Sequence, residues 1–379
     1  MIITNIELKN WKNFADVNVA CGKRMFLIGP NASGKSNFLD ALRFLRDVAQ
    51  DGLEKAILAR GGISAVRYLN ARKQSDITVA VTLDDVWQYS LTFGAEKGKS
   101  VPLVQKETVY TRNESASPWK TILKRPSDED SKDALRLTQT ALQQVNANVK
   151  FREVVEFFSS IQYRHILPQL VREPKAFSPN PISNDPYGRD LVQSIWNASK
   201  RTRSRLGKIN EALKVAVPQL ENLTVKQDKN GIPHFEVNYT HWRARGAYQS
   251  ESSFSDGTLR LLALLWSILD TGGPLLLEEP ELSLHEEIVA QLPSIFSRMD
   301  RDKKKAIRQV FITTHAEAML RDPGIGANEI LRFEPDREGT QVLLPESQEI
   351  TAIQRGDLTV ADLLLPKTRP ANVERLRLF

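Results

Sequence analysis

The chain has 379 residues, 41% of them hydrophobic and 26% charged, and carries a formal net charge of +6. This composition is typical of a globular protein long enough for two domains, and a single cysteine, Cys21, excludes an internal disulfide. The chain opens without a leader-like segment, and its longest apolar run, at residues 259–269, is too short to span a bilayer. We therefore expect a cytoplasmic protein that does not enter a membrane.

The first third of the chain predicts strands around one amphipathic helix. Residues 2–9 alternate apolar and polar side chains, as a half-buried strand does, and residues 17–19 and 25–28 are two further strand candidates. Apolar side chains in residues 37–46 recur at helical spacing. Four more strand candidates are separated by polar, glycine-containing linkers and predict an antiparallel meander; they are residues 77–83, 86–93, 103–111 and 119–123.

The middle of the chain is less regular. We expect helix from the acidic stretch at 126–133 as far as Phe158, then a strand at 161–167. Five prolines between positions 168 and 186 mark a boundary. Residues 190–217 predict one long helix or two, and the segments that flank Gly231, residues 223–226 and 234–239, predict a short hairpin.

Helix and strand alternate again in the last third of the chain. The predicted order is helix, strand, helix and strand, at residues 258–269, 274–278, 284–299 and 309–314. Such alternation predicts an α/β fold.

A phosphate-binding motif joins the strand at 25–28 to the helix at 37–46. The residues are Gly29, Pro30, Asn31, Ala32, Ser33, Gly34, Lys35 and Ser36, which match G-x-x-x-x-G-K-[ST] at every fixed position. Glycines let backbone N–H groups approach phosphate oxygens, and the start of the helix adds the positive end of its dipole. Lys35 would neutralise phosphate charge and the hydroxyl of Ser36 would bind Mg²⁺. A chance match in a chain of this length has odds of about one in a hundred, so an ordinary strand–turn–helix is the weaker interpretation.

Three further patterns deliver polar groups to the ends of predicted elements. An apolar run ends in Glu278 and Glu279, and because adjacent strand residues point to opposite sides, the two carboxylates can serve different roles. Ser255, Asp256 and Gly257 precede an apolar helix; they are an N-cap or an anion site. A third apolar run delivers His315. A lone histidine carries little information, but the four features in this order are informative together.

Together these residues resemble ABC-type ATPases of the RecF/SMC/OLD group, in its compact AAA-family branch. The opening Ile6–Phe14 is similar to the first strands of that group, and Asn37 extends the phosphate loop in the group's form. Ser255-Asp256-Gly257 resembles the signature motif, Glu278-Glu279-Pro280-Glu281 and Leu284-His285 resemble Walker B and the D-loop, and Thr313-Thr314-His315 resembles the switch histidine.

The resemblance implies an α/β ATPase head with a mixed P-loop sheet, an antiparallel β subdomain and a helical insertion. The expected segments are an N-terminal lobe at 1–165, the insertion at 166–248, a C-terminal lobe at 249–345 and a tail at 346–379.

The resemblance also implies a homo-oligomer in which two heads sandwich two ATP molecules. Ser255, Asp256 and Gly257 of one head would contact the γ-phosphate that the partner's loop holds. Glu278 would assist Mg²⁺, although this group usually has Asp there. Glu279 would polarise the attacking water and His315 would sense the γ-phosphate. The group's glutamine loop has three candidates, Gln74, Gln88 and Gln162.

Compact members of this branch are often ATPase subunits of two-gene bacterial anti-phage systems, resembling those of Septu and PARIS. Our leading hypothesis is therefore a sensor or scaffold with a separately encoded nuclease or toxin effector. The alternative is a RecF-like repair or recombination ATPase that acts directly on DNA. No heptad run predicts coiled-coil arms, and the roughly sixty residues after His315 are too few for a Toprim nuclease domain. The basic Arg201, Arg205 and Lys208 would form one helix face toward DNA or an acidic partner, although most basic runs are solvated surface.

Overall fold

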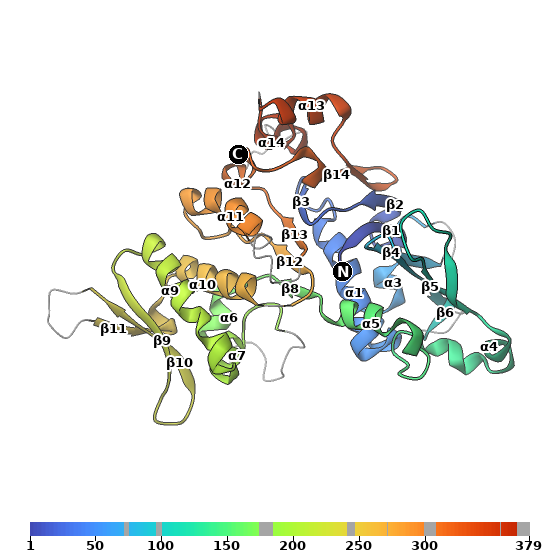
Figure 1. The fold of residues 1–379 in the computed structure, drawn as a ribbon, viewed down its shortest axis with the longest axis horizontal. Helices are drawn as coiled ribbons and strands as arrows, with labels where there is room; N and C mark the ends of the chain where they lie inside the picture. The colour runs from blue at the N-terminus through green and yellow to red at the C-terminus, as the bar shows by residue number, and fades with distance from the viewer. Residues whose placement is uncertain are drawn as a thin grey trace, which may run out of the picture. The chain divides into compact units, whose positions relative to one another are not determined.

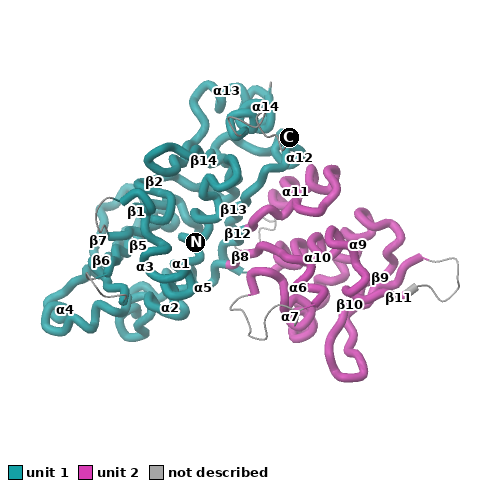
Figure 2. The backbone as a smooth tube through the Cα atoms, turned by 180° about the vertical axis from the view of Figure 1, so that it is seen from behind, with its two compact units in different colours: residues 1–161, 272–276, 302–379 teal, residues 162–271, 277–301 magenta. Residues whose placement is uncertain are grey.

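The computed structural model describes residues 1–71, 76–95, 101–173, 185–240, 247–270, 272–298, 308–356 and 358–369. The chain forms two compact units (Figure 2). Unit 1 consists of Met1–Ile161, Gly272–Leu276 and Asp302–Phe379, and unit 2 of Gln162–Thr271 and Leu277–Arg301.

Unit 1 contains a six-stranded antiparallel sheet with the order β2-β1-β4-β5-β6-β7 (Figure 1). Its strands are β1 (Ile3–Trp11), β2 (Phe14–Ala20), β4 (Ile77–Leu83), β5 (Trp87–Ala95), β6 (Pro102–Thr111) and β7 (Lys120–Arg125). Asp84 and Asp85, both with positive φ, form the tight turn between β4 and β5, a backbone whose twist matches a hairpin. The predicted meander at residues 77–123 is confirmed.

A second sheet is mixed and has β3 (Arg24–Ile28) near its centre. β13 (Val310–Thr313) and β14 (Ile330–Asp336) pair with β3 in parallel, one on each side, and β15 (Gly339–Leu343) pairs antiparallel with β14. On the far side of β13, β12 (Leu275–Glu278) begins in unit 1, where Leu275 N donates to Gln309 O at 2.8 Å. The last two residues of β12 belong to unit 2, as does the next strand, β8 (Gln162–Arg164).

Helix α1 (Lys35–Asp51) packs against both sheets of unit 1 through aromatic rings. Phe38 lies 6.4 Å from Phe14 of β2 and 5.5 Å from Phe333 of β14, centroid to centroid. One and a half turns on, Phe44 lies 5.1 Å from Trp11 of β1 and 5.2 Å from Phe93 of β5. All are fully buried. The amphipathic spacing predicted for residues 37–46 is thus confirmed, and it anchors the helix that follows the glycine-rich loop.

The remaining elements of unit 1 are short helices at the periphery of these sheets. They are α2 (Leu53–Leu58), α3 (Ile63–Val66), α4 (Asp128–Lys132), α5 (Arg152–Ser159), α12 (Glu317–Leu320), α13 (Ser347–Arg355) and α14 (Val360–Leu363). Throughout the described part of the chain, no helix combines the length and the apolar character that crossing a membrane requires.

Unit 2 packs helices on a small antiparallel sheet of order β11-β10-β9. Its helices are α6 (Pro168–Arg172), α7 (Leu191–Asn197), α8 (Lys200–Arg203), α9 (Arg205–Ala216), α10 (Asp256–Leu269) and α11 (Glu286–Arg298). The strands are β9 (Leu220–Gln227), β10 (Pro233–Tyr239) and β11 (Ala247–Ser250). Phe235, Val237 and Leu213 are fully buried in its core together with the apolar side of α10. The predicted hairpin around Gly231 is confirmed, and β11 adds a third strand to it.

Three predictions for the middle of the chain are confirmed only in part. The stretch expected to be helical up to Phe158 is mostly turns, and α5 starts only at Arg152. The strand expected at 161–167 ends at Arg164, because Pro168 starts α6 and the backbone N–H of His165 donates to Pro186 O, outside any sheet. The helix or two helices expected at 190–217 are three, because Ser199 caps a new helix and Ser204 separates α8 from α9.

This last break also corrects the basic stripe. Arg201 lies in α8, whereas Arg205 and Lys208 lie in α9, and Arg205 is partly buried and pairs with Asp270 at 3.3 Å. Arg201 and Lys208 remain exposed. The sequence also contains a basic run at residues 301–305, which lies outside the described residues.

Candidate nucleotide-binding site

The glycine-rich loop runs from β3 into α1, and its backbone leaves no room for side chains at two glycines. A Cβ on Gly29 would lie 2.6 Å from Phe333 O, and one on Gly34, where φ is 95°, would lie 2.0 Å from Asn13 Nδ2. Ala32 takes a left-handed φ of 61° within the same turn. The backbone contact at Gly29 and the left-handed φ of Gly34 both favour glycine, so the sequence pattern here is a steric requirement of the turn.

The loop presents positive groups to its interior. Lys35 is buried, and its Nζ donates to the carbonyl oxygens of Gly29 at 2.8 Å and Pro30 at 3.0 Å. Helix α1 begins here with no side-chain cap and no acidic residue in its first turn, which leaves the positive end of its dipole uncompensated by side chains. The Ser33 hydroxyl is fully buried and has no hydrogen-bond partner among the residues that the structure describes. A buried ammonium, a helix N-terminus and an unsatisfied hydroxyl in one turn fit the phosphate chain of a nucleotide.

Asn13 holds this loop from outside. Its Nδ2 donates to Ser33 O at 3.2 Å and to Thr340 Oγ1 at 2.7 Å, and its Oδ1 accepts from Asn37 Nδ2 at 2.8 Å. One side chain therefore ties the loop to α1 and to β15. Asn13 lies in the opening motif of the sequence, but nothing in the sequence predicted that its side chain contacts the glycine-rich loop.

The third apolar run brings His315 to the edge of the sheet at which β3 ends. Thr313 pairs with Leu27 in a parallel register, and Thr314 N donates to Leu27 O at 3.2 Å. His315 follows directly and is partly exposed, whereas Thr313 and Thr314 are buried. Because the carboxyl ends of parallel strands share one edge, the histidine and the start of the phosphate loop lie at the same edge.

In unit 2, Ser255 is the N-cap of α10. Its Oγ accepts a hydrogen bond from Thr258 N at 3.1 Å, as the N-cap interpretation predicts. The Asp256 carboxylate accepts from Arg172 at 2.6 Å and from Gln169 at 3.2 Å, both in α6. Gly257 lies so close to the loop after β12 that a Cβ there would be 2.5 Å from Ser283 O.

The two adjacent glutamates differ in backbone conformation. Glu278 is the last residue of β12, while Glu279 lies beyond the strand with a left-handed φ of 43°. Both were expected to be strand residues, so that premise was wrong: a turn, and not strand alternation, separates them. The Glu278 carboxylate accepts a hydrogen bond from the Tyr163 hydroxyl, and its backbone oxygen lies 3.3 Å from Nδ1 of His165.

Arg260 of α10 is a buried cation in the same unit. Its side chain is 5% exposed, and its Nε has no hydrogen-bond partner among the described residues. Burial lowers the pKa of this guanidinium, while the carboxylates of Asp256, Glu281 and Glu279 oppose the shift. Arg260, Arg164 and Glu278 line a cavity of about 10 Å³, which is the room of one water molecule.

The structure selects none of the three candidates for the glutamine loop. Gln74 lies outside the described residues, Gln88 belongs to β5, and the Gln162 amide donates to Asp270 Oδ2 at 2.9 Å. Across the described parts of both units, no three His, Cys, Asp or Glu side chains converge into a preformed metal cluster. Mg²⁺ bound by one or two side chains together with phosphate oxygens needs no such cluster.

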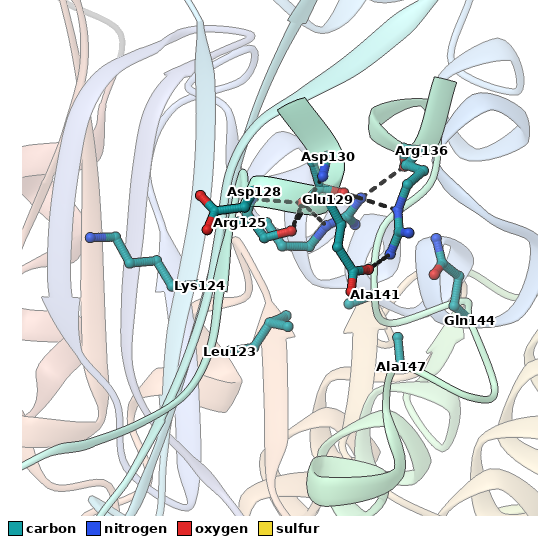
Figure 3. A pocket seen from close by; sticks show the side chains of 11 residues that line it. Leu123, Lys124, Arg125, Asp128, Glu129, Asp130, Arg136, Ala141, Gln144 and Ala147 are labelled. Atoms are coloured by element: carbon teal, nitrogen blue, oxygen red, sulfur yellow. Dashed lines mark hydrogen bonds and ion pairs between the residues drawn. The ribbon is translucent and has the colours of Figure 1, made fainter. Parts of the chain in front are cut away.

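A larger cavity of about 450 Å³ lies in unit 1 beside β7 and α4 (Figure 3). Its two arginines are already paired with carboxylates: Arg125 pairs with Glu107 and Asp130, and Arg136 with Glu129. Arg125 also donates to backbone oxygens, among them Gln139 O at 2.8 Å. These groups hold the fold together, so the cavity is a weaker candidate for phosphate than the glycine-rich loop.

Residues 24–320 match the family model described as "AAA domain, putative AbiEii toxin, Type IV TA system". The match covers more than three quarters of the chain, from β3 through the phosphate loop to the residues after His315. The chain belongs to this AAA-domain family. AAA families are families of ATPases, so the resemblance found in the sequence is confirmed at the level of an ABC/SMC-like AAA ATPase.

One solved structure supports the fold of this AAA-domain protein. An SMC head bound to the C-winged helix domain of ScpA superimposes with a TM-score of 0.51 over 93% of this chain and 99% of the other, at 15% identity. The SMC head domain from Thermotoga maritima matches over 91% and 100% with a TM-score of 0.42 at 14% identity. The expected ATPase head, with a mixed sheet, an antiparallel subdomain and an insertion, is confirmed.

One curated protein shows a short local similarity. The endonuclease GajA of Bacillus cereus (strain VD045) is 47% identical over 47 residues, which is 12% of this chain and 8% of GajA. The aligned segment thus spans less than a tenth of that relative.

Proposed function

We propose that this AAA-domain protein binds and hydrolyses Mg²⁺-ATP in the cytoplasm. The observation that carries the proposal is the glycine-rich loop, in which the buried Lys35 ammonium and the start of α1 bring positive charge together. Lys35 and the loop from Gly29 to Asn37 would bind the triphosphate. Ser36 and Glu278 would hold Mg²⁺, which when bound screens phosphate charge. Glu279 would orient the attacking water, and His315 would contact the γ-phosphate.

Two heads would complete each other's sites. Ser255, Asp256 and Gly257 form the start of a fourteen-residue helix, and the partly exposed end of that helix suits a γ-phosphate held by a second copy. We therefore propose an ATP-dependent homodimer.

Turnover by two matched variants tests the hydrolysis. Glu279→Gln should bind ATP and lower turnover about a hundredfold or more, the scale of a lost catalytic base, whereas Glu287→Gln, at an exposed position of α11, should be neutral. In the presence of ATP, Glu279→Gln should double in mass in solution. If Glu279→Gln is a monomer both with and without ATP, the ATP-dependent dimer is contradicted. Full turnover in Glu279→Gln together with no turnover in Glu278→Gln would exchange the proposed roles of Glu278 in Mg²⁺ binding and Glu279 in orienting water.

At the biological level, we propose a sensor or scaffold subunit of a bacterial anti-phage system with a separately encoded nuclease or toxin effector. The local similarity to an endonuclease, GajA, and the toxin–antitoxin wording of the family description support this class. Cells that carry the gene with its neighbouring gene should resist phage, and Lys35→Ala should abolish resistance. Resistance without the neighbour, or ATPase activity stimulated by DNA ends, favours the RecF-like alternative instead.

A further inference from the structure

Glu278 is contacted at two points by β8 and by the residue that follows this strand. The hydroxyl of Tyr163 donates a hydrogen bond to Glu278 Oε2, and two residues further along, Nδ1 of His165 lies 3.3 Å from the backbone oxygen of Glu278. Residues two apart on an extended chain share a face, so β8 and the residue after it present both groups to the same partner. Side chain and backbone of Glu278 are contacted together.

Burial, a ring contact and backbone hydrogen bonds hold Tyr163 and His165 in place. Tyr163 is 6% exposed. The His165 ring packs edge-on against Tyr187, with centroids 6.4 Å apart. The backbone N–H groups of His165 and Leu167 donate to Pro186 O at 2.8 Å and Tyr187 O at 3.0 Å. The strand that carries Tyr163 is therefore anchored on the side that leads to α6.

A buried tyrosine hydroxyl needs an acceptor in any protein, and a backbone carbonyl would satisfy it. Here the acceptor is the carboxylate at the end of β12. A hydrogen bond to one carboxylate oxygen fixes the plane of the group, which otherwise rotates about its last side-chain bond. Mg²⁺ requires near-ideal ligand geometry, so the orientation of a carboxylate ligand affects its affinity.

We propose that Tyr163 is a positioning residue for Glu278, and that its hydroxyl orients the carboxylate for the Mg²⁺ of the bound nucleotide. This inference rests on the proposed Mg²⁺-ATP function. Tyr163 touches neither nucleotide nor metal in this assignment and acts through Glu278 alone.

Tyr163→Phe removes the hydroxyl and keeps the ring, and Tyr248→Phe, at an exposed position of unit 2, is the matched control. A fluorescent ATP analogue is titrated with Mg²⁺ and again with EDTA, and ATP turnover is measured against Mg²⁺ concentration. With EDTA, Tyr163→Phe should bind the analogue like the wild type. The ratio of the affinity with Mg²⁺ to the affinity with EDTA should be about tenfold smaller in Tyr163→Phe than in the wild type. The Mg²⁺ concentration for half-maximal turnover should rise about tenfold. Both effects are typical of losing a residue that hydrogen-bonds to a metal ligand.

A double-mutant cycle with Glu278→Gln separates positioning from general stability. Once Glu278 is replaced, adding Tyr163→Phe should cause no further loss of the Mg²⁺-dependent affinity, because both changes remove one interaction. Additive losses, or an unchanged Mg²⁺ dependence in Tyr163→Phe, overturn the proposal while the ATPase function stands. A loss of affinity that is equal with Mg²⁺ and with EDTA, together with a lower melting temperature, assigns the hydroxyl to folding and also overturns it. A wild-type chain that fails to bind the analogue overturns both proposals.

Discussion

Gly257 offers a sharp test of how α10 and the loop after β12 approach each other. A Cβ on this residue would lie 2.5 Å from Ser283 O, about 0.9 Å inside the 3.4 Å at which ordinary van der Waals contact begins. Ser283 has a left-handed φ of 62°, so its backbone is already in a sparsely populated conformation and has little room to yield. Gly257→Ala therefore has to displace the start of α10 from the loop by roughly an ångström.

We expect Gly257→Ala to lower the free energy of unfolding by about 1–3 kcal/mol, the usual cost of overpacking. Turnover should fall about a hundredfold, which is the effect of misplacing a reacting group by an ångström. Gly257→Val should be more severe. ATP binding should be unchanged, because the loop that carries Lys35 belongs to unit 1.

The matched control is Gly207→Ala in α9, where no described atom beyond the adjacent residues and the helix's own backbone lies within 4 Å of the added carbon. It should stabilise the protein by about 0.4–1 kcal/mol, because alanine restricts the unfolded chain. Steady-state ATP turnover, titration with a fluorescent ATP analogue and thermal unfolding measure the three quantities. Wild-type turnover at wild-type stability in Gly257→Ala would refute the idea that this close approach is required.

Three other changes have defined outcomes. Lys35→Ala should weaken nucleotide binding at least a hundredfold in the same titration. Charge-assisted hydrogen bonds contribute about 1.5–3 kcal/mol each, and about 1.4 kcal/mol corresponds to a tenfold change in affinity. Unchanged affinity would mean that the nucleotide binds elsewhere. Burial raises the pKa of Asp40, but Arg60 and Lys12 outweigh burial, so the pKa in the folded protein is lowered. The ionised carboxylate therefore stabilises the fold at pH values above its unfolded pKa, and this stabilisation is lost as the pH falls through the lowered pKa. Asp40→Asn should lower unfolding free energy at pH 7 and flatten its decline in acid, and parallel pH profiles contradict this. If DNA is bound, Arg201→Glu with Lys208→Glu should reduce the slope of log affinity against log salt by about 2, and an unchanged slope returns both residues to solvated surface.

Local signals in the sequence were sufficient for the phosphate loop and for most strands around it. A backbone contact at 2.6 Å dictates Gly29, a φ of 95° dictates Gly34, and the strand–loop–helix around them follows from periodicity. The family motifs also placed Ser255 at the start of a helix and Glu278 at the end of a strand, as the structure has them.

The contacts that hold these residues could not be predicted, because they join segments distant in sequence. Tyr163 meets Glu278 across 115 positions, Arg172 meets Asp256 across 84, and Asn13 meets Thr340 across 327. No periodicity or spacing encodes such pairs. The prediction of helix before α5 was wrong for a related reason. The backbone N–H groups of Ala141 and Leu142 donate to the buried carboxylate of Glu107, at 2.7 and 3.4 Å, in place of helical hydrogen bonds.

Several residues in the proposed site oppose folding, and their location supports a role for the site. Ala32 and Glu279 are held at positive φ, which costs about 1–3 kcal/mol for each such residue. The Ser33 hydroxyl and the Arg260 Nε are buried without partners among the described residues, and each unmet group adds a desolvation cost. Glycine at positions 32 and 279, and apolar residues at 33 and 260, would make a more stable protein. If the proposed nucleotide supplies the interactions that these groups lack, saturating Mg²⁺-ATP should raise the melting temperature.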